Sequence, residues 1–311
     1  MPTPGASDAA IVMFGDGRDW HGRSLTRAFK RRGITPLLAP LNSCGFSTAT
    51  KTGLDIPGLG DRLPEGAFVR FVPGGSFEEV TLYLGVLHAL RELGVTVWND
   101  ARAIERCVDK STTTFLLQRA GIPTPRTFAR VGRDEAEAIT ATVLAEGHLL
   151  VQKPLFGAQG KGLRLITAAA DLASPEEVNG VYYLQEFIRP AQKHHQDWRL
   201  FVCQGRVIAA MIRHGSSWIT NIKQGARAKA AIASQELIDL AVRAAACVGA
   251  NYAGVDIIQA QDGRFLVLEV NSMPAWNGLQ EVSHVRISDH LVDAFLDAAL
   301  PGARREGQEG A

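Results

Sequence analysis

The sequence predicts a mixed α/β fold whose first unit is a small parallel α/β domain, with α+β character in the parts that follow. Three observations support this prediction. Short apolar runs alternate with helical patterns in the first hundred residues, hairpin signals dominate the second half, and 46% hydrophobic with 21% charged residues among 311 is an ordinary globular composition. We expect structured units at residues 1–98, 99–188 and 189–300, followed by a disordered polar tail at residues 301–311.

The first unit alternates strand and helix along the chain. Residues 10–14 form a short apolar strand, and residues 20–32 then have helical composition. Ser76 and Glu79 form a capping box, after which apolar residues recur at helical spacing until a strand returns at residues 95–98. Strands separated by helices in this way predict a parallel sheet.

The two later units mix helices with strands that pair locally. The second unit is expected to contain two helices and three strands, at residues 110–120, 134–145, 149–153, 163–166 and 182–188. The third is expected to contain a hairpin, a helix that starts after the N-cap Ser234, and a second hairpin at residues 254–271. Hairpins of this kind predict antiparallel sheets.

Charge and composition exclude several classes of protein. Thirty-three Lys and Arg residues against 32 Asp and Glu residues leave a formal net charge of +1, which does not suggest nucleic-acid binding. No apolar run is long enough to span a membrane, the first twenty residues do not resemble a signal peptide, and the four cysteines lack metal-site spacing. We therefore expect a cytoplasmic protein without a nucleic-acid or membrane partner, and whether it forms a homo-oligomer stays open.

The last hairpin carries two carboxylates on one face. If Asp262 and Gly263 are the two loop residues of the turn, counting back along both strands places Asp256 opposite Glu269. Like charges directly opposed in a sheet are destabilising, so something must compensate them. Asn271 lies on the same face, and two carboxylates with an amide oxygen are ligands that Mg²⁺ prefers. A proton, an arginine partner or a shifted register are the alternatives to a metal.

A glycine-rich loop upstream of this hairpin suits phosphate binding. The strand at residues 149–153 delivers Lys153, and the loop after it contains three glycines and a second lysine, namely Gly157, Gly160, Lys161 and Gly162. Glycines let backbone N–H groups approach phosphate oxygens closely. The spacing matches neither a P-loop nor a Rossmann fingerprint, and a flexible hairpin is the alternative interpretation.

The combination of these motifs resembles the ATP-grasp superfamily, and most closely its RimK-like glutamate ligases. The resemblance covers roughly residues 99–278. The segments that carry it, in chain order, are Asp109-Lys110-Ser-Thr, Val-Gln-Lys153-Pro before the glycine loop, Leu-Gln185-Glu186-Phe-Ile188, Asp197-Trp-Arg199, Thr-Asn221, Gly-Val-Asp256-Ile and Leu-Glu269-Val-Asn271.

The resemblance implies an ATP-grasp fold and an ATP- and Mg²⁺-dependent carboxylate–amine ligase, with Mn²⁺ as an alternative metal. In such an enzyme a substrate carboxylate attacks the γ-phosphate of ATP, and an amine, here expected to be that of glutamate, opens the acyl phosphate to an amide. By resemblance, the residues expected to bind ATP are Lys110, Lys153, Gly157, Gly160, Lys161, Gly162, Gln185, Glu186, Phe187, Ile188 and Asn221.

The same resemblance assigns a metal site and a set of catalytic cations. The ligands expected to hold two Mg²⁺ ions are Asp256, Glu269 and Asn271. The cations expected to neutralise charge on the transferring oxygens are Arg199, Lys223 and Arg213.

The expected acceptor pocket departs from the family pattern. Lys223 and Gln224 stand where protein-modifying members carry a more basic segment, and Trp276 follows the metal face where the family has small residues. Arg18 and Arg23 lie beside the loop that ends the first strand, where ligands bind in open α/β sheets. We expect Arg18, Arg23 and Trp276 to contact a small-molecule cofactor precursor. A solvated basic surface and core packing are the respective alternatives.

Two other functions stay open on sequence alone. A glutamate ligase that modifies a protein or peptide would differ only in its acceptor pocket. A non-catalytic ATP-binding regulatory protein would keep the fold without turnover, although the intact carboxylate pair argues against it.

Overall fold

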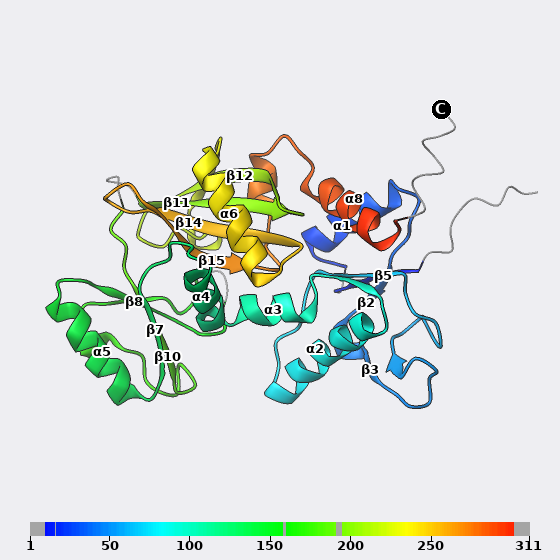
Figure 1. Ribbon diagram of the computed structural model, residues 1–311, viewed down its shortest axis with the longest axis horizontal. Helices are drawn as coiled ribbons and strands as arrows, with labels where there is room; N and C mark the ends of the chain where they lie inside the picture. Colours follow the sequence, from blue (N-terminus) through cyan, green and yellow to red (C-terminus); the bar gives the residue numbers. More distant parts are fainter. Residues whose placement is uncertain (1–9, 16, 158–159, 191–194, 302–311) are drawn as a thin grey trace, which may run out of the picture.

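The computed structural model describes residues 10–15, 17–157, 160–190 and 195–301. It has the predicted mixed α/β architecture, built around three sheets and one two-stranded ribbon (Figure 1). Apart from Pro301, the tail predicted to be disordered lies outside the described residues. Within those ranges, no helix is both long and apolar enough to cross a bilayer.

The N-terminal domain contains the predicted parallel sheet, with strand order β2-β1-β5-β6. Its strands are β1 (Ile11–Phe14), β2 (Leu37–Ala39), β5 (Gly66–Val69) and β6 (Thr96–Trp98), and its ribbon pairs β3 (Gly45–Phe46) with β4 (Leu54–Asp55). The helices are α1 (Trp20–Lys30), α2 (Phe77–Glu92) and the 3₁₀ helix η1 (Leu41–Ser43). The predicted capping box starts α2, and Asp19 caps α1 by accepting the Gly22 N–H at 2.6 Å.

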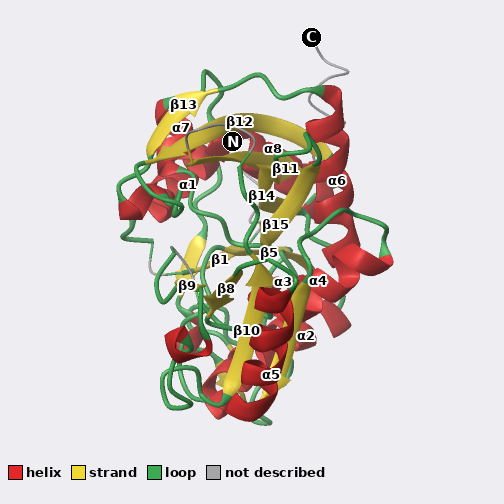
Figure 2. Cartoon of the chain, turned by 90° about the vertical axis from the view of Figure 1, so that its left-hand side faces the viewer, coloured by secondary structure: helices red, strands yellow, loops and turns green. Residues whose placement is uncertain are grey.

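The central subdomain is an antiparallel sheet of order β7-β10-β8-β9 with α5 packed against it (Figure 2). Its elements are α3 (Ala101–Val108), α4 (Lys110–Arg119), β7 (Thr127–Val131), α5 (Arg133–Ala145), β8 (Leu150–Lys153), β9 (Arg164–Ile166), η2 (Ala169–Asp171) and β10 (Val181–Glu186). Strand β7 and helix α3 had no clear signal in the sequence. Buried residues that include Val143, Leu150, Tyr182 and Leu184 give this subdomain a core of its own.

The C-terminal subdomain is an antiparallel sheet of order β13-β12-β11-β14-β15, with α6 packed against it. Its elements are β11 (His195–Cys203), β12 (Arg206–Gly215), η3 (Ile222–Gln224), β13 (Arg227–Ala230), α6 (Gln235–Val248), β14 (Tyr252–Gln259), β15 (Phe265–Asn271), α7 (Asn277–Glu281) and α8 (Ile287–Ala299). Both predicted hairpins are present, and Ser234 caps α6 as expected.

The β14–β15 hairpin confirms the predicted pairing of Asp256 with Glu269 but not the predicted turn. The Ala260 N–H donates to the Arg264 carbonyl at 2.8 Å, so the loop has three residues instead of two. A β-bulge then restores the expected pairing, because Ile257 pairs with Val267 and Leu268 is the extra residue. The predicted register is therefore correct at the two carboxylates, because the longer loop and the bulge shift the pairing of the strands in opposite directions.

One hydrophobic core joins the N-terminal domain to the C-terminal subdomain. Phe68 of β5 stacks on Tyr252 of β14 with ring centroids 5.3 Å apart, and Phe295 of α8 meets Phe68 edge-on at 5.4 Å. The side chain of Asn99 is fully buried and donates to the Tyr252 carbonyl at 2.8 Å. Figure 1 shows the consequence, with α8 from the end of the chain lying beside α1 from its start.

Candidate active site

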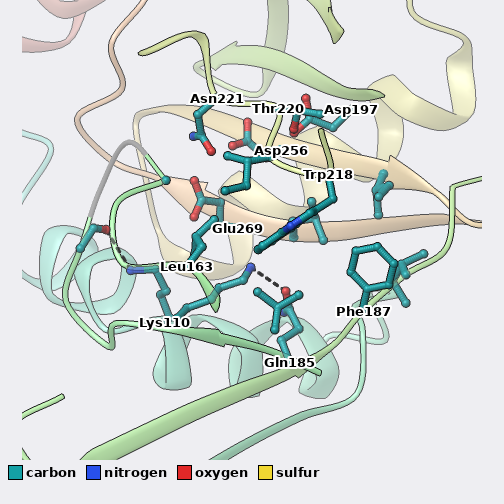
Figure 3. A pocket seen from close by; sticks show the side chains of 18 of the residues that line it. Lys110, Leu163, Gln185, Phe187, Asp197, Trp218, Thr220, Asn221, Asp256 and Glu269 are labelled. Atoms are coloured by element: carbon teal, nitrogen blue, oxygen red, sulfur yellow. Dashed lines mark hydrogen bonds between the residues drawn. The ribbon is translucent and has the colours of Figure 1, made fainter. Parts of the chain in front are cut away.

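A cavity lies between the central sheet and the β14–β15 hairpin, and we call it the central cavity (Figure 3). Its empty space, counted together with the open mouth, is about 850 Å³. It brings together most of the residues predicted from the motifs: Lys110, Lys153, Gly157, Gly160, Lys161, Gln185, Glu186, Phe187, Ile188, Arg213, Asn221, Asp256 and Glu269.

Two lysines enter the central cavity from different elements. Lys153 ends β8, and its Nζ donates to Gln185 Oε1 at 2.7 Å. Lys110 begins α4, and its Nζ donates to the carbonyl oxygens of Leu155 at 3.2 Å and Gly157 at 2.9 Å. Burial lowers the pKa of both ammonium groups, although the nearby Glu269 carboxylate opposes this shift. Both lysines thus donate to neutral oxygens, and an anionic ligand would replace these with stronger bonds between opposite charges.

The glycine loop approaches the opposite wall closely. Gly160 has φ +71°, and a Cβ at that position would lie 2.5 Å from Asn221 Oδ1. Gly162 has φ +72°, and a Cβ there would lie 2.8 Å from the ring of Pro154. Both positions therefore require glycine for conformation and for space.

The Asp256 carboxylate is held by two buried arginines. Arg199 donates to both of its oxygens, with Nη2 to Oδ2 at 2.7 Å, and Arg213 Nη2 lies 3.0 Å from the same Oδ2. Arg213 also binds Asp197, with Nε to Oδ1 at 2.7 Å. Burial opposes ionisation of Asp256, but the two guanidinium groups outweigh it and hold the pKa of Asp256 below its ordinary value. The arginine partner that the sequence left as an alternative is therefore present.

Glu269 differs from Asp256 in its surroundings. It faces the central cavity, and its Oε1 accepts the Asn271 Nδ2–H at 3.0 Å. Among the described residues, no group of three or more His, Cys, Asp and Glu side chains is arranged as a metal site. Two carboxylates and one amide oxygen on neighbouring strand positions nevertheless match the hard oxygen donors that Mg²⁺ takes together with phosphate. The residues present therefore fit the predicted ion, with Asp256 shared with arginines.

Several predicted residues lie outside the wall of the central cavity. Arg199 is buried behind Asp256, Lys223 is exposed on η3, and Gly162 is close to the cavity but does not line it. Asn271 lines an adjacent cavity that also includes Lys110, Gly157 and Glu269.

The residues expected to contact the acceptor have separate locations. Trp276 is fully buried against His21 and Phe201, which agrees with core packing and not with direct substrate contact. Arg23 is exposed, and its guanidinium donates to the Arg18 carbonyl. Arg18 lines a different cavity, at the carboxyl edge of the parallel sheet.

Sequence reasoning predicted Phe187 and Ile188 but missed other members of the apolar wall of the central cavity. Trp218 meets Phe187 edge-on with ring centroids 6.1 Å apart, and Leu163, Ile258 and Leu268 also line the cavity. Trp218 lies in a polar stretch without periodicity, so a lone aromatic residue in a loop was the only signal. Leu268 reaches the cavity because it is the bulge residue, which no spacing rule anticipates.

Comparison with known proteins agrees with this geometry. The RimK-like ATP-grasp domain family matches residues 107–295. A tetrahydromethanopterin:alpha-L-glutamate ligase of Methanococcus maripaludis is 37% identical over 211 residues, covering 66% of this chain and 70% of the relative. One from Methanosarcina acetivorans is 29% identical and covers 91% of this chain and 97% of its own.

A solved structure extends the similarity to the fold. The ATP-grasp ligase PsnB, complexed with a minimal precursor, Mg and ADP, superposes with a TM-score of 0.71 at 25% identity. The match covers 94% of this chain and 99% of PsnB. With the family match spanning more than half of the chain, the protein belongs to the RimK-like ATP-grasp family and is an ATP-grasp amino-acid ligase.

Proposed function

We propose that the protein joins glutamate to the carboxylate of a small-molecule cofactor precursor, using ATP and Mg²⁺ and forming an acyl phosphate. The observation that carries this proposal is the central cavity, where two half-buried lysines, a carboxylate pair and a glycine loop line the same space. Tetrahydromethanopterin:alpha-L-glutamate ligases among the relatives support glutamate and a pterin-like acceptor.

The lysines and the apolar walls would bind the nucleotide. Lys110 and Lys153 would exchange their neutral acceptors for phosphate oxygens, a charge-assisted contact that is stronger than the one it replaces. Phe187 and Trp218 flank the mouth near Gln185, where a flat base would stack. Gly157 and Gly160 let backbone amides approach the phosphates.

The acidic wall would position the reacting groups. Asp256, Glu269 and Asn271 would hold Mg²⁺, which when bound supplies positive charge to the transferring phosphoryl group. Arg199 and Arg213 keep Asp256 ionised. Because it lines the cavity, Arg213 is also placed to stabilise charge on the acceptor carboxylate, with Lys223 on η3 as the further cation.

A peptide or protein carboxylate is the second candidate acceptor. A relative from Saccharolobus solfataricus, the alpha-aminoadipate–LysW ligase LysX, is 30% identical over 66% of this chain. PsnB was also solved with a precursor peptide. The two candidates differ in the acceptor and not in the nucleotide chemistry.

The test is a turnover screen with product analysis. The protein is incubated with ATP, Mg²⁺ and L-glutamate against tetrahydromethanopterin, furan and deazaflavin carboxylates, and peptides with free C-termini. We expect ADP and phosphate in equal amounts with one amide product, and no AMP. AMP with pyrophosphate would contradict the acyl phosphate, and absence of ADP with every acceptor would contradict ligation to any acceptor in the screen.

A further inference from the structure

A second cavity lies at the carboxyl edge of the parallel sheet, and we call it the strand-end cavity. It is lined where three strands end, by Gly15 after β1, Pro40 after β2 and Arg70 after β5. In the order β2-β1-β5-β6, the chain leaves β1 toward β2 on one side and reaches β5 on the other. Open α/β sheets bind ligands at such a reversal point, outside the carboxyl ends of the strands.

Arg70 is the buried charge in the wall of this cavity. Its exposed fraction is 9%, and its Nε has no hydrogen-bond partner in the part of the chain that the structure describes. Nη1 lies 3.5 Å from the Met273 carbonyl oxygen, and Nη2 lies 3.8 Å from Asp19 Oδ2, so both contacts are long. The guanidinium carbon sits 5.2 Å from the ring centroid of Trp276.

These contacts leave the Arg70 guanidinium incompletely satisfied. A buried guanidinium with five N–H donors normally meets a carboxylate in two parallel short bonds. Asp19 does not provide them, since its Oδ1 accepts the Gly22 N–H at 2.6 Å and its Oδ2 lies 3.2 Å from His21 Nδ1. A buried charge without close partners is costly unless a ligand supplies them.

We propose that Arg70 binds a carboxylate that one of the two substrates carries in addition to its reacting group. This inference rests on the proposed function and extends it to the substrate contacts in the N-terminal domain. Arg18 lines the same cavity as a second cation, and Asn42 contributes an amide.

The strand-end cavity is a neighbour of the cavity that Asn271 and Glu269 line. Met273, whose carbonyl Arg70 approaches, lines the cavity described above that Asn271 and Glu269 also line, and we call it the intermediate cavity. The loop after β5 lies between the two spaces, because Phe71 and Pro73 line the strand-end cavity while Val72 lines the intermediate one. The two cavities are therefore neighbours on either side of this loop.

The shape of the cavity limits the ligand further. Met13, Leu41 and Phe71 give it a largely apolar wall around the polar groups. Among the described lining residues, Arg70 is the buried cation. A carboxylate on an aliphatic stem, as in a glutamyl side chain, matches this combination of charge and wall.

A purely structural role for Arg70 predicts different behaviour. If the stacking on Trp276 and the contact to Met273 were its purpose, Arg70→Gln would lower the thermal midpoint of the ligand-free protein. It would also leave substrate affinities unchanged. A binding role predicts an unchanged or higher midpoint, because a poorly partnered buried charge is removed, together with weaker binding.

Equilibrium binding tests the site without turnover. Thermal unfolding is followed with L-glutamate or glutarate in the absence of nucleotide, with L-glutamine and sodium chloride at matched concentration as controls. We expect at least one of the two carboxylates to stabilise the parent protein, and Arg70→Gln to weaken that affinity at least tenfold. Arg62→Gln, at an exposed arginine of the same domain outside the cavity, should bind like the parent. Equal affinity in Arg70→Gln and parent would overturn the proposal.

Steady-state kinetics distinguishes the two sources of the carboxylate. With tetrahydromethanopterin as acceptor, a tenfold rise in KM for L-glutamate alone assigns the site to the amine donor. The same rise for the acceptor alone assigns it to the acceptor, and KM for ATP should not change in either case. No change in either KM would overturn the proposal. Failure of turnover in the parent would count against the proposed function and leave the equilibrium result to stand alone.

A second variant guards against loss of folding in Arg70→Gln. Asn42 is exposed on the wall of the strand-end cavity, so Asn42→Asp adds a negative charge there without disturbing the core. We expect L-glutamate or glutarate to bind at least fivefold more weakly to this variant. Unchanged binding would show that the carboxylate does not enter this cavity.

Discussion

The central cavity and the strand-end cavity both present buried cations, but they differ in how those cations are satisfied. In the central cavity Lys153 and Arg213 have short bonds to Gln185 and Asp197. In the strand-end cavity the polar contacts of Arg70 with described residues are long, and its Nε has no partner among them. A site can therefore be preorganised by its own residues or left incomplete for a ligand. The two kinds of site should respond differently to mutation.

The largest effect is expected from Glu269→Gln in the central cavity. The change keeps the shape but removes the carboxylate that has no arginine partner among the described residues, so the proposed metal loses a charged ligand. We expect Mg²⁺-dependent turnover to fall by about a thousandfold or more, roughly 4 kcal/mol in activation free energy. ADP release is the measurement, with Glu281→Gln, at an exposed glutamate on α7, as the control. Turnover within tenfold of the parent would exclude Glu269 as a metal ligand.

A large effect on stability is expected from Asp256→Ala. From sequence alone, removing either carboxylate relieves a like-charge pair and leaves the fold intact. The structure changes this expectation, because Arg199 and Arg213 would lose their shared partner inside the protein. We expect a loss of about 3–5 kcal/mol in the free energy of unfolding, measured by urea denaturation. Glu269→Ala should cost less than about 1 kcal/mol, and equal losses would remove this distinction between the two acids.

The smallest effect concerns His21, beside the strand-end cavity. Its Nε2 accepts the backbone N–H of Trp276 at 3.0 Å. Burial, aided by the charge of Arg70, lowers the pKa of His21 to about 4. The unfolded chain binds a proton with a pKa of about 6.5, so between these values the unfolded state holds more protons. Stability should therefore fall as the pH is lowered from 6.5 toward 4.

His21→Gln tests this dependence by removing the titrating group. Thermal midpoints measured across this pH range should decline less steeply in the variant than in the parent. His290→Gln, at an exposed position on α8, should retain the slope of the parent. Parallel curves for all three proteins would contradict a neutral buried His21.

Contiguous motifs explain why the central cavity was largely predictable. Lys153 and the glycines after it are adjacent in sequence, and the hairpin turn is close enough to Asp256 and Glu269 for counting to reach them. The three-residue loop and the Leu268 bulge were not predicted. Their effects on the strand register cancel, so the predicted pairing of Asp256 with Glu269 was still correct.

The strand-end cavity shows what sequence reasoning could not supply. Arg70 follows a four-residue strand that was not recognised, and nothing near it in sequence marks an anion site. Its surroundings arise only when β1, β2 and β5 are brought side by side, and its burial depends on Trp276 from the other end of the chain. Arg18 and Arg23 were placed at the correct edge of the sheet by the general rule for strand ends, but only Arg18 lines the cavity.

The core shared by the two ends of the chain limits how the enzyme can be rearranged. Phe68 and Trp98 of the N-terminal domain pack on Phe295 of α8, which lies at the end of the ATP-grasp region in sequence. The N-terminal domain is consequently not a module that can be exchanged between relatives at a cut near residue 99. A chimera that alters the acceptor would have to carry α8 with it, whereas the sheet of β7, β8, β9 and β10 with α5, which has its own core, could be replaced as a unit.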